Sequence, residues 1–129
     1  MKKFIIASLS TLASIGFTTT FAALPATIIN TTSATIDIQY TVCSQENGKI
    51  CTLVKGHKLG SLGSGNNRLN IVGTLQPKSD GLIIQNAVAI NNQGNPIAKL
   101  NQPCSLPSSS DVLVLEAGNN SDIACRYTR

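Results

Sequence analysis

The chain has 129 residues, of which 12% are charged and 4% aromatic, and its formal net charge at pH 7 is +4. That length corresponds to a single domain. Binding to nucleic acid calls for clustered cations beside aromatic side chains on which bases stack. Here the lysines and arginines are spread along the chain and there is no Trp, so we expect no nucleic-acid partner.

Residues 1–22 have the pattern of a cleaved signal peptide. Two lysines at positions 2 and 3 precede an uncharged apolar stretch, and Thr20-Phe21-Ala22 supplies small residues three and one positions before a cut. The apolar stretch is about 14 residues long, shorter than the roughly 20 that a membrane-spanning helix needs. We therefore expect a bacterial protein exported to the periplasm or the medium. Its mature part would be one domain, 23–129, without a transmembrane span.

After the leader, the chain is rich in Ile, Val, Thr, Asn and Ser, and its first clear element is a strand. In "TIDIQYTVC" (35–43), apolar Ile36, Ile38, Tyr40 and Val42 alternate with other residues, and a period of two with β-branched side chains indicates a half-buried strand. We expect weaker strands at 26–30, 50–55, 68–75, 81–91, 96–100, 111–116 and 122–128.

The strand at 81–91 differs from the others because it is apolar on both faces. In "GLIIQNAVAI", strict alternation places Ile84, Val88 and Ile90 on one face and Ile83, Ala87 and Ala89 on the other. Such a strand belongs in the centre of a sheet. Short strands separated by segments rich in Gly, Pro, Asn and Ser predict an all-β fold, which we take as a small disulfide-stapled antiparallel β-sandwich, or alternatively as a small β-barrel.

Of the four cysteines, the first two surround an Asn-Gly turn. In "YTVCSQENGKICTLV" (40–54), an alternating strand runs into "ENG" and then into a second β-rich segment, which predicts a hairpin. A three-residue loop at 46–48 would place Cys43 opposite Cys51, at a separation near that of a disulfide.

Disulfides explain these cysteines better than a metal site or a redox pair. Zinc sites use Cys pairs two to four residues apart and thioredoxin-like sites use Cys-x-x-Cys, whereas neither spacing occurs here. An even number of cysteines in an exported chain favours disulfides. Four cysteines allow three connectivities; we favour Cys43–Cys51 with Cys104–Cys125 and expect no bound metal.

His57 and the glycine-rich segment 60–68 are the first candidates for chemistry. A histidine can act as a general base near neutral pH, but no acidic residue between Glu46 and Asp80 is available to orient it. We therefore interpret His57 as a solvated loop residue at the end of a strand. The segment "GSLGSGNNR" lacks the Lys and the following helix of a phosphate-binding loop, so we expect a mobile connector.

The carboxylates form no recognisable catalytic pair. A glycosidase needs two of them about 5–9.5 Å apart, and the sequence points to no such pair and contains no Gly-x-Ser-x-Gly motif. We expect no enzymatic activity and no cofactor. The acidic residues in question are Asp37, Glu46, Asp80, Asp111, Glu116 and Asp122.

An export leader, short strands and an early disulfide make the chain similar to chaperone-assembled bacterial pilins. Subunits of that family end in a strand with a penultimate Tyr and carry a Gly upstream of it. Here Tyr127 is third from the end and Gly118 lies 11 residues before Arg129. The later pair, Cys104 with Cys125, is not part of the family's pattern, so the resemblance implies no functional residue.

These observations favour an exported non-catalytic interaction or structural protein, such as an assembly subunit, a surface factor or a periplasmic accessory protein. Its partners would be other proteins or further copies of itself. The alternative is a secreted binding module or inhibitor that acts through loops at 56–68 or 91–95, and a small hydrolase comes third. An open sheet edge would favour the first function and a rigid protruding loop the second. A pocket that joins His57 to a carboxylate would favour the third.

The leader generates a direct prediction. N-terminal sequencing of the protein from its natural source should begin at Ala23, because signal peptidase would cut after Ala22. A cytoplasmic protein that still begins at Met1 would contradict the predicted export.

Overall fold

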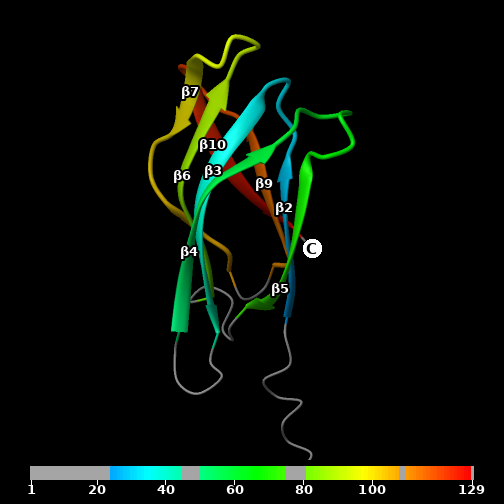
Figure 1. Cartoon of the computed structure of the whole chain (residues 1–129), viewed down its shortest axis with the longest axis vertical. Coiled ribbons are helices and arrows are strands. Elements are labelled where there is room, and N and C mark those ends of the chain that lie inside the picture. The colour runs from blue at the N-terminus through cyan, green and yellow to red at the C-terminus, as the bar shows by residue number, and fades with distance from the viewer. Residues whose placement is uncertain (1–23, 45–49, 75–80, 108–109, 129) are drawn as a thin grey trace, which may run out of the picture.

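The computed structural model describes residues 24–44, 50–74, 81–107 and 110–128, and every element in these ranges is a β-strand (Figure 1). The predicted leader at 1–22 and the predicted hairpin loop at 46–48 lie outside the described residues. The strands are β2 (Leu24–Asn30), β3 (Thr35–Ser44), β4 (Ile50–Leu59), β5 (Arg68–Thr74), β6 (Leu82–Ile90), β7 (Pro96–Leu100), β8 (Cys104–Ser105), β9 (Val112–Ala117) and β10 (Asp122–Thr128).

The described strands form one continuous sheet in the order β4-β3-β6-β7-β10-β9-β2-β5, with β8 paired to β6. The sheet curves into a nearly closed barrel (Figure 1), and β5 comes close to β3 without pairing with it. The all-β prediction is confirmed, and the barrel alternative describes the sheet better than two separate layers. The expected antiparallel arrangement holds for most pairs, but β2 pairs with β9, and β10 with β7, in parallel.

The core lies inside this curved sheet and is mostly aliphatic. On β3 the predicted alternation is confirmed, since Ile36, Ile38 and Tyr40 are buried. Facing strands contribute further aliphatic side chains, and burial of this apolar surface is the main favourable term for folding. Fully or almost fully buried members of the core are Ile28, Leu59, Leu82, Ile84, Leu106, Leu113 and Leu115.

Two register shifts meet at Gln39 on the central strand β3. On one side the β3–β4 register shifts between Ile38 and Tyr40, and on the other side the β3–β6 register shifts between Gln39 and Tyr40. An extra residue in one strand of a pair reverses the faces that follow it. Strict alternation along β6 is therefore wrong, and Ile84 shares the core-facing side with Ala87 and Ala89, which are all buried.

The β3–β4 shift also explains why β4 is longer than predicted. Gly56 has φ +73°, a left-handed conformation that glycine adopts without steric cost. The strand therefore continues through the irregularity to Leu59, which is fully buried. His57 consequently lies within β4 and not in a loop after a strand, which corrects the sequence-based prediction.

A buried amide at the end of β2 ties several strands together. The Asn30 side chain is fully buried, and its Nδ2 donates hydrogen bonds to the carbonyl oxygens of Ala34, Leu59 and Gly60 at 2.8, 3.2 and 2.9 Å. Its Oδ1 accepts hydrogen bonds from the backbone N–H and the hydroxyl of Thr32 at 2.8 and 2.7 Å. Asn30 therefore joins the end of β2, the turn before β3 and the end of β4.

We predict that Asn30→Asp destabilises the fold by about 3 kcal/mol, because it places an oxygen in place of Nδ2 against three carbonyl oxygens in a buried site. Denaturant unfolding measures the loss. The matched control is Asn70→Asp, since Asn70 is exposed and its Oδ1 only accepts a hydrogen bond from the Thr27 hydroxyl, which a carboxylate also accepts. Similar losses in the two variants would contradict the role assigned to Asn30.

Candidate functional site

All four cysteines are paired in disulfides, and both bridges are the predicted ones. Cys43 lies directly opposite Cys51 in the β3–β4 ladder, with their Cα atoms 3.9 Å apart. The neighbouring pairs, Thr41 with Leu53 and Val42 with Thr52, follow the same register. The first disulfide therefore staples β4 to β3 across the hairpin.

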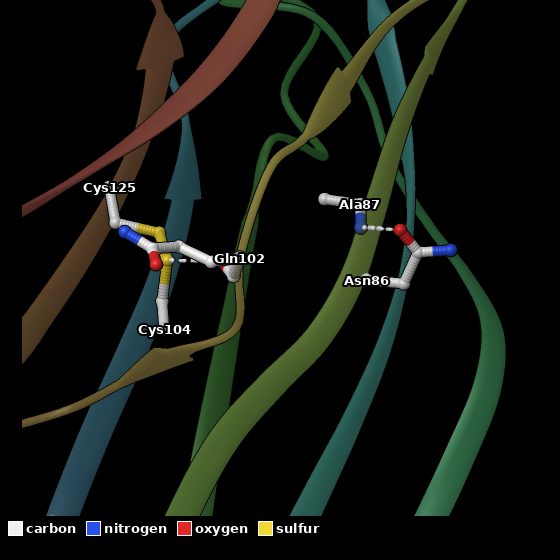
Figure 2. Close-up of a disulfide and its surroundings, with 5 residues drawn as sticks. All are labelled: Asn86, Ala87, Gln102, Cys104 and Cys125. Atoms are coloured by element: carbon white, nitrogen blue, oxygen red, sulfur yellow. Dashed lines mark hydrogen bonds between the residues drawn. A yellow bond between two sulfur atoms is a disulfide. The ribbon is translucent and has the colours of Figure 1, made fainter.

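The second disulfide (Figure 2) connects β10 to β8, which pairs with β6, and one strand, β7, lies between β6 and β10 in the sheet order. Cys104 on β8 is buried within the core cluster, and Cys125 on β10 packs against that cluster. Their Cα atoms are 6.5 Å apart. The Gln102 carbonyl oxygen lies 3.8 Å from the Cys104 sulfur, which has no proton to donate in a disulfide. This bridge therefore ties the last strand to β8, whose ladder partner is β6.

His57 does not meet a carboxylate on its own side of the sheet. It faces Ile38 across the β3–β4 ladder, whereas Lys58 faces Asp37, so His57 and Asp37 point to opposite sides. The His57 ring instead packs edge-on against Tyr40, with ring centroids 6.4 Å apart and planes at 84°. Burial raises the pKa of the Tyr40 hydroxyl, so this phenol stays neutral at physiological pH.

The carboxylates of Asp37, Glu116 and Asp122 each contact a different partner. Asp37 Oδ2 lies 3.7 Å from Lys58 Nζ in a largely exposed pair, which contributes little to stability. Glu116 on β9 accepts a hydrogen bond from Arg126 Nε on β10 at 2.8 Å. Asp122 on β10 accepts one from the Asn101 side chain at 2.6 Å. Glu46 and Asp80 lie outside the described residues.

A shallow hollow of about 310 Å³ lies on the outer face where the two register shifts meet. Asp37 and Gln39 on β3 and Asn86 on β6 supply polar groups to it. Asn86 Oδ1 accepts a hydrogen bond from the Ala87 backbone N–H at 3.0 Å (Figure 2). His57 does not line this hollow. Its other lining residues are Ile38, Gly56, Val88, Ile90 and Pro96.

The loop between β4 and β5, residues 60–67, is held by hydrogen bonds and protrudes beside the barrel (Figure 1). The Leu62 N–H donates to the Thr32 carbonyl at 2.9 Å, and the Asn67 side chain donates to the Asn30 carbonyl at 3.0 Å. A side chain at Gly60 would collide with Ser64 and Asn66, which pack over it. These contacts argue against the mobile connector expected from the sequence. Leu62 is 63% exposed in this loop.

One edge of the sheet is open over a segment without charge. β4 is an end strand, and among the described residues it pairs with β3 alone; its first half lies at the outer rim in Figure 1. We call residues 50–54, "ICTLV", the β4 edge segment. Within it, Ile50 and Leu53 are 57% and 46% exposed, and Cys51 and Thr52 are also exposed.

The two halves of β4 differ in how they protect the edge. Natural edge strands resist pairing with other chains through charged side chains, especially Lys, and through bulges. The second half carries such features: Lys55 and Lys58, which are exposed, and the irregularity at Gly56. The β4 edge segment carries none of them.

The backbone of the β4 edge segment is also oriented for further pairing. In an antiparallel ladder, closely spaced facing residues do not hydrogen-bond each other, and Cys43 and Cys51 have Cα atoms only 3.9 Å apart. The N–H and C=O of Cys51 therefore point away from β3. The direction of the backbone N–H and C=O groups repeats every two residues along a strand, so the N–H and C=O of Leu53 also point away from β3. The sequence predicted the disulfide here but not the open edge, because strand order is not visible in a single sequence.

No protein-family model matches this chain, and no curated protein matches it. Among solved structures, the chain is similar to the NMR structure of a protein from Eubacterium rectale. The two share 14% sequence identity over 82% of this chain and 88% of that chain, with a TM-score of 0.46. Separately, the described residues contain no helix that is long and apolar enough to cross a membrane.

The disulfides generate a prediction about relative stability. We expect Cys104→Ser with Cys125→Ser to lower the melting temperature more than Cys43→Ser with Cys51→Ser. Loop entropy alone favours the longer closure by less than about 1 kcal/mol, but Cys104 is also buried in the core and its bridge fixes the last strand. Thermal unfolding of both double variants measures the difference. A larger loss from the hairpin pair would contradict this ranking.

Proposed function

We propose that the protein is an exported, non-catalytic interaction or structural protein that binds a protein partner at the β4 edge segment. Export is supported by the leader pattern at 1–22 and by two disulfides in a small domain, since disulfides persist in oxidising compartments. An assembly subunit, a surface factor and a periplasmic accessory protein all fit this description.

The observation that carries the proposal is that the β4 edge segment is uncharged and that, among the described residues, it pairs with β3 alone. An extended partner strand would add to the sheet there through hydrogen bonds to the backbone of Cys51 and Leu53, a recognised mode of peptide recognition. The exposed side chains of Ile50 and Leu53 would supply apolar contacts on the two faces of the added strand. Backbone bonds provide affinity in this mode, and side-chain contacts provide specificity.

A second candidate function is a secreted binding module or inhibitor that acts through the 60–67 loop. Leu62 is exposed on a loop that is already fixed by hydrogen bonds, and a preorganised loop loses little conformational entropy on binding. A small hydrolase ranks below both, because the outer hollow contains Asp37 but not His57. Among the described residues, no group of three or more His, Cys, Asp or Glu side chains is placed to hold a metal.

Position-specific cross-linking separates the first two functions. A photoreactive amino acid would replace Leu53 in one variant, Leu62 in a second and Gln93, which lies in an exposed turn, in a third as the background control. Each variant would be expressed in the producing organism, illuminated and analysed by mass spectrometry. We expect a protein adduct from position 53, with the attachment point in an extended segment of the partner.

The other outcomes of this experiment are also informative. An adduct from position 62 and none from position 53 would favour the loop-based binding module. Adducts of equal yield from all three positions, or from none, would contradict the proposal that β4 is an interaction edge.

A further inference from the structure

We propose that the strand added at the β4 edge segment belongs to a different protein and carries an Asp or Glu that faces Lys55. This inference rests on the proposed function and names the chemistry of the partner. The partner strand would run antiparallel to β4, the orientation that gives the more stable pairing per residue. Its carboxylate would lie on the outer face of the sheet, next to an apolar side chain that covers Leu53.

Lys55 directly follows the β4 edge segment and is exposed. Val54 faces Tyr40, whose side chain is buried in the core, so Val54 points inward. Its two neighbours, Leu53 and Lys55, therefore point to the outer face. Residues that face each other across an antiparallel pair have Cβ atoms about 4.5–5.5 Å apart. An Asp or Glu opposite Lys55 would thus bring its carboxylate within reach of the ammonium group.

The charge of Lys55 has no counterpart in the described part of the chain. Lys58 Nζ lies 3.7 Å from an Asp37 oxygen, whereas no described carboxylate forms an ion pair with Lys55. Residues 49–59 contain three lysines and no Asp or Glu. The edge therefore presents a positive charge at one end of an uncharged segment. Because opposite charges that face each other across a strand pair are stabilising, this edge is complementary to an acidic strand.

Lysines at both ends of the segment also act against a second copy of this chain. An antiparallel pairing of two β4 edge segments centred on Thr52 would set Lys55 of each copy opposite Lys49 of the other. Like charges in facing positions are destabilising, and β4 has no carboxylate of its own to offer. The partner is thus selected by a repulsive element as well as by an attractive one.

Two synthetic peptides, TEVITVIT and TKVITVIT, test the proposal on the oxidised protein. In the antiparallel register the fourth residue of each peptide faces Leu53, and the second residue, Glu or Lys, faces Lys55. NMR titration at low salt should shift the amides of Cys51 and Leu53, and the Glu peptide should bind about fivefold more tightly than the Lys peptide. The preference should fall below about twofold in about 1 M salt, where exposed charges are screened within about 3 Å.

The variant Lys55→Glu should reverse this preference, so that the Lys peptide binds more tightly. The matched control is Lys99→Glu, which makes the same change of charge at an exposed lysine on β7, a strand with a neighbour on each side in the sheet order. It should keep the preference of the unchanged protein for the Glu peptide. Thermal unfolding verifies that both variants are folded.

Three outcomes would overturn the proposal: equal binding of the two peptides, an unchanged preference in Lys55→Glu, or no shift at Cys51 and Leu53 up to about 5 mM peptide. The cross-link from position 53 separates this inference from the proposed function. An adduct with a segment that has an Asp or Glu within three residues of the attachment point supports both. An adduct with a segment that lacks one overturns the acidic strand, and the proposed function stands.

Discussion

The side-chain amide of Asn30 is the constraint on which the arrangement of β2, β3, β4 and the 60–67 loop depends. A buried polar group is costly unless its hydrogen bonds are made, and Asn30 makes them with backbone groups of the turn before β3 and of the end of β4. Its backbone N–H and C=O also bond to Asn67, the residue before β5. One residue therefore fixes the point where the two ends of the sheet approach each other.

The register shifts on both sides of Gln39 determine what the rest of β4 can do. Because the shift at Gly56 lets the strand continue, Leu59 reaches the core and its carbonyl reaches Asn30. The same irregularity, together with Lys55 and Lys58, makes the second half of β4 a poor template for another strand. The second half of this edge is thus protected by an irregularity and two lysines, and the first half has neither.

Much of the fold could be predicted from the sequence because its strands carry strong local signals. Alternation identified β3, and turn residues bounded the others, while a three-residue loop at 46–48 predicted the register that places Cys43 opposite Cys51. The shift within β6 could not be predicted, because an extra residue at Gln85 is only defined by its partner strand. Likewise the parallel pairing of β2 with β9 joins residues far apart in the chain, and no local pattern reports it.

The candidate site was the least predictable part, and the reason is physical. An open edge is a property of strand order, which depends on contacts between distant segments. The sequence nevertheless contained a relevant clue, since "ICTLV" is an uncharged β-rich segment next to two lysines. This segment indicates an edge available for strand addition only once β4 is known to be the end strand of the sheet.

The Cys43–Cys51 disulfide connects the stability of this edge with its proposed use. A terminal strand that must bind a partner has to leave its outward N–H and C=O groups free, and so it cannot be held by a further strand of its own domain. Within the part of the chain that the structure describes, its only ladder is then the one with β3, and backbone bonds fray at a strand end. A covalent bond between side chains holds residue 51 to β3 without using any outward backbone group. The staple therefore keeps the edge in register and available at the same time, which is the combination that strand addition requires.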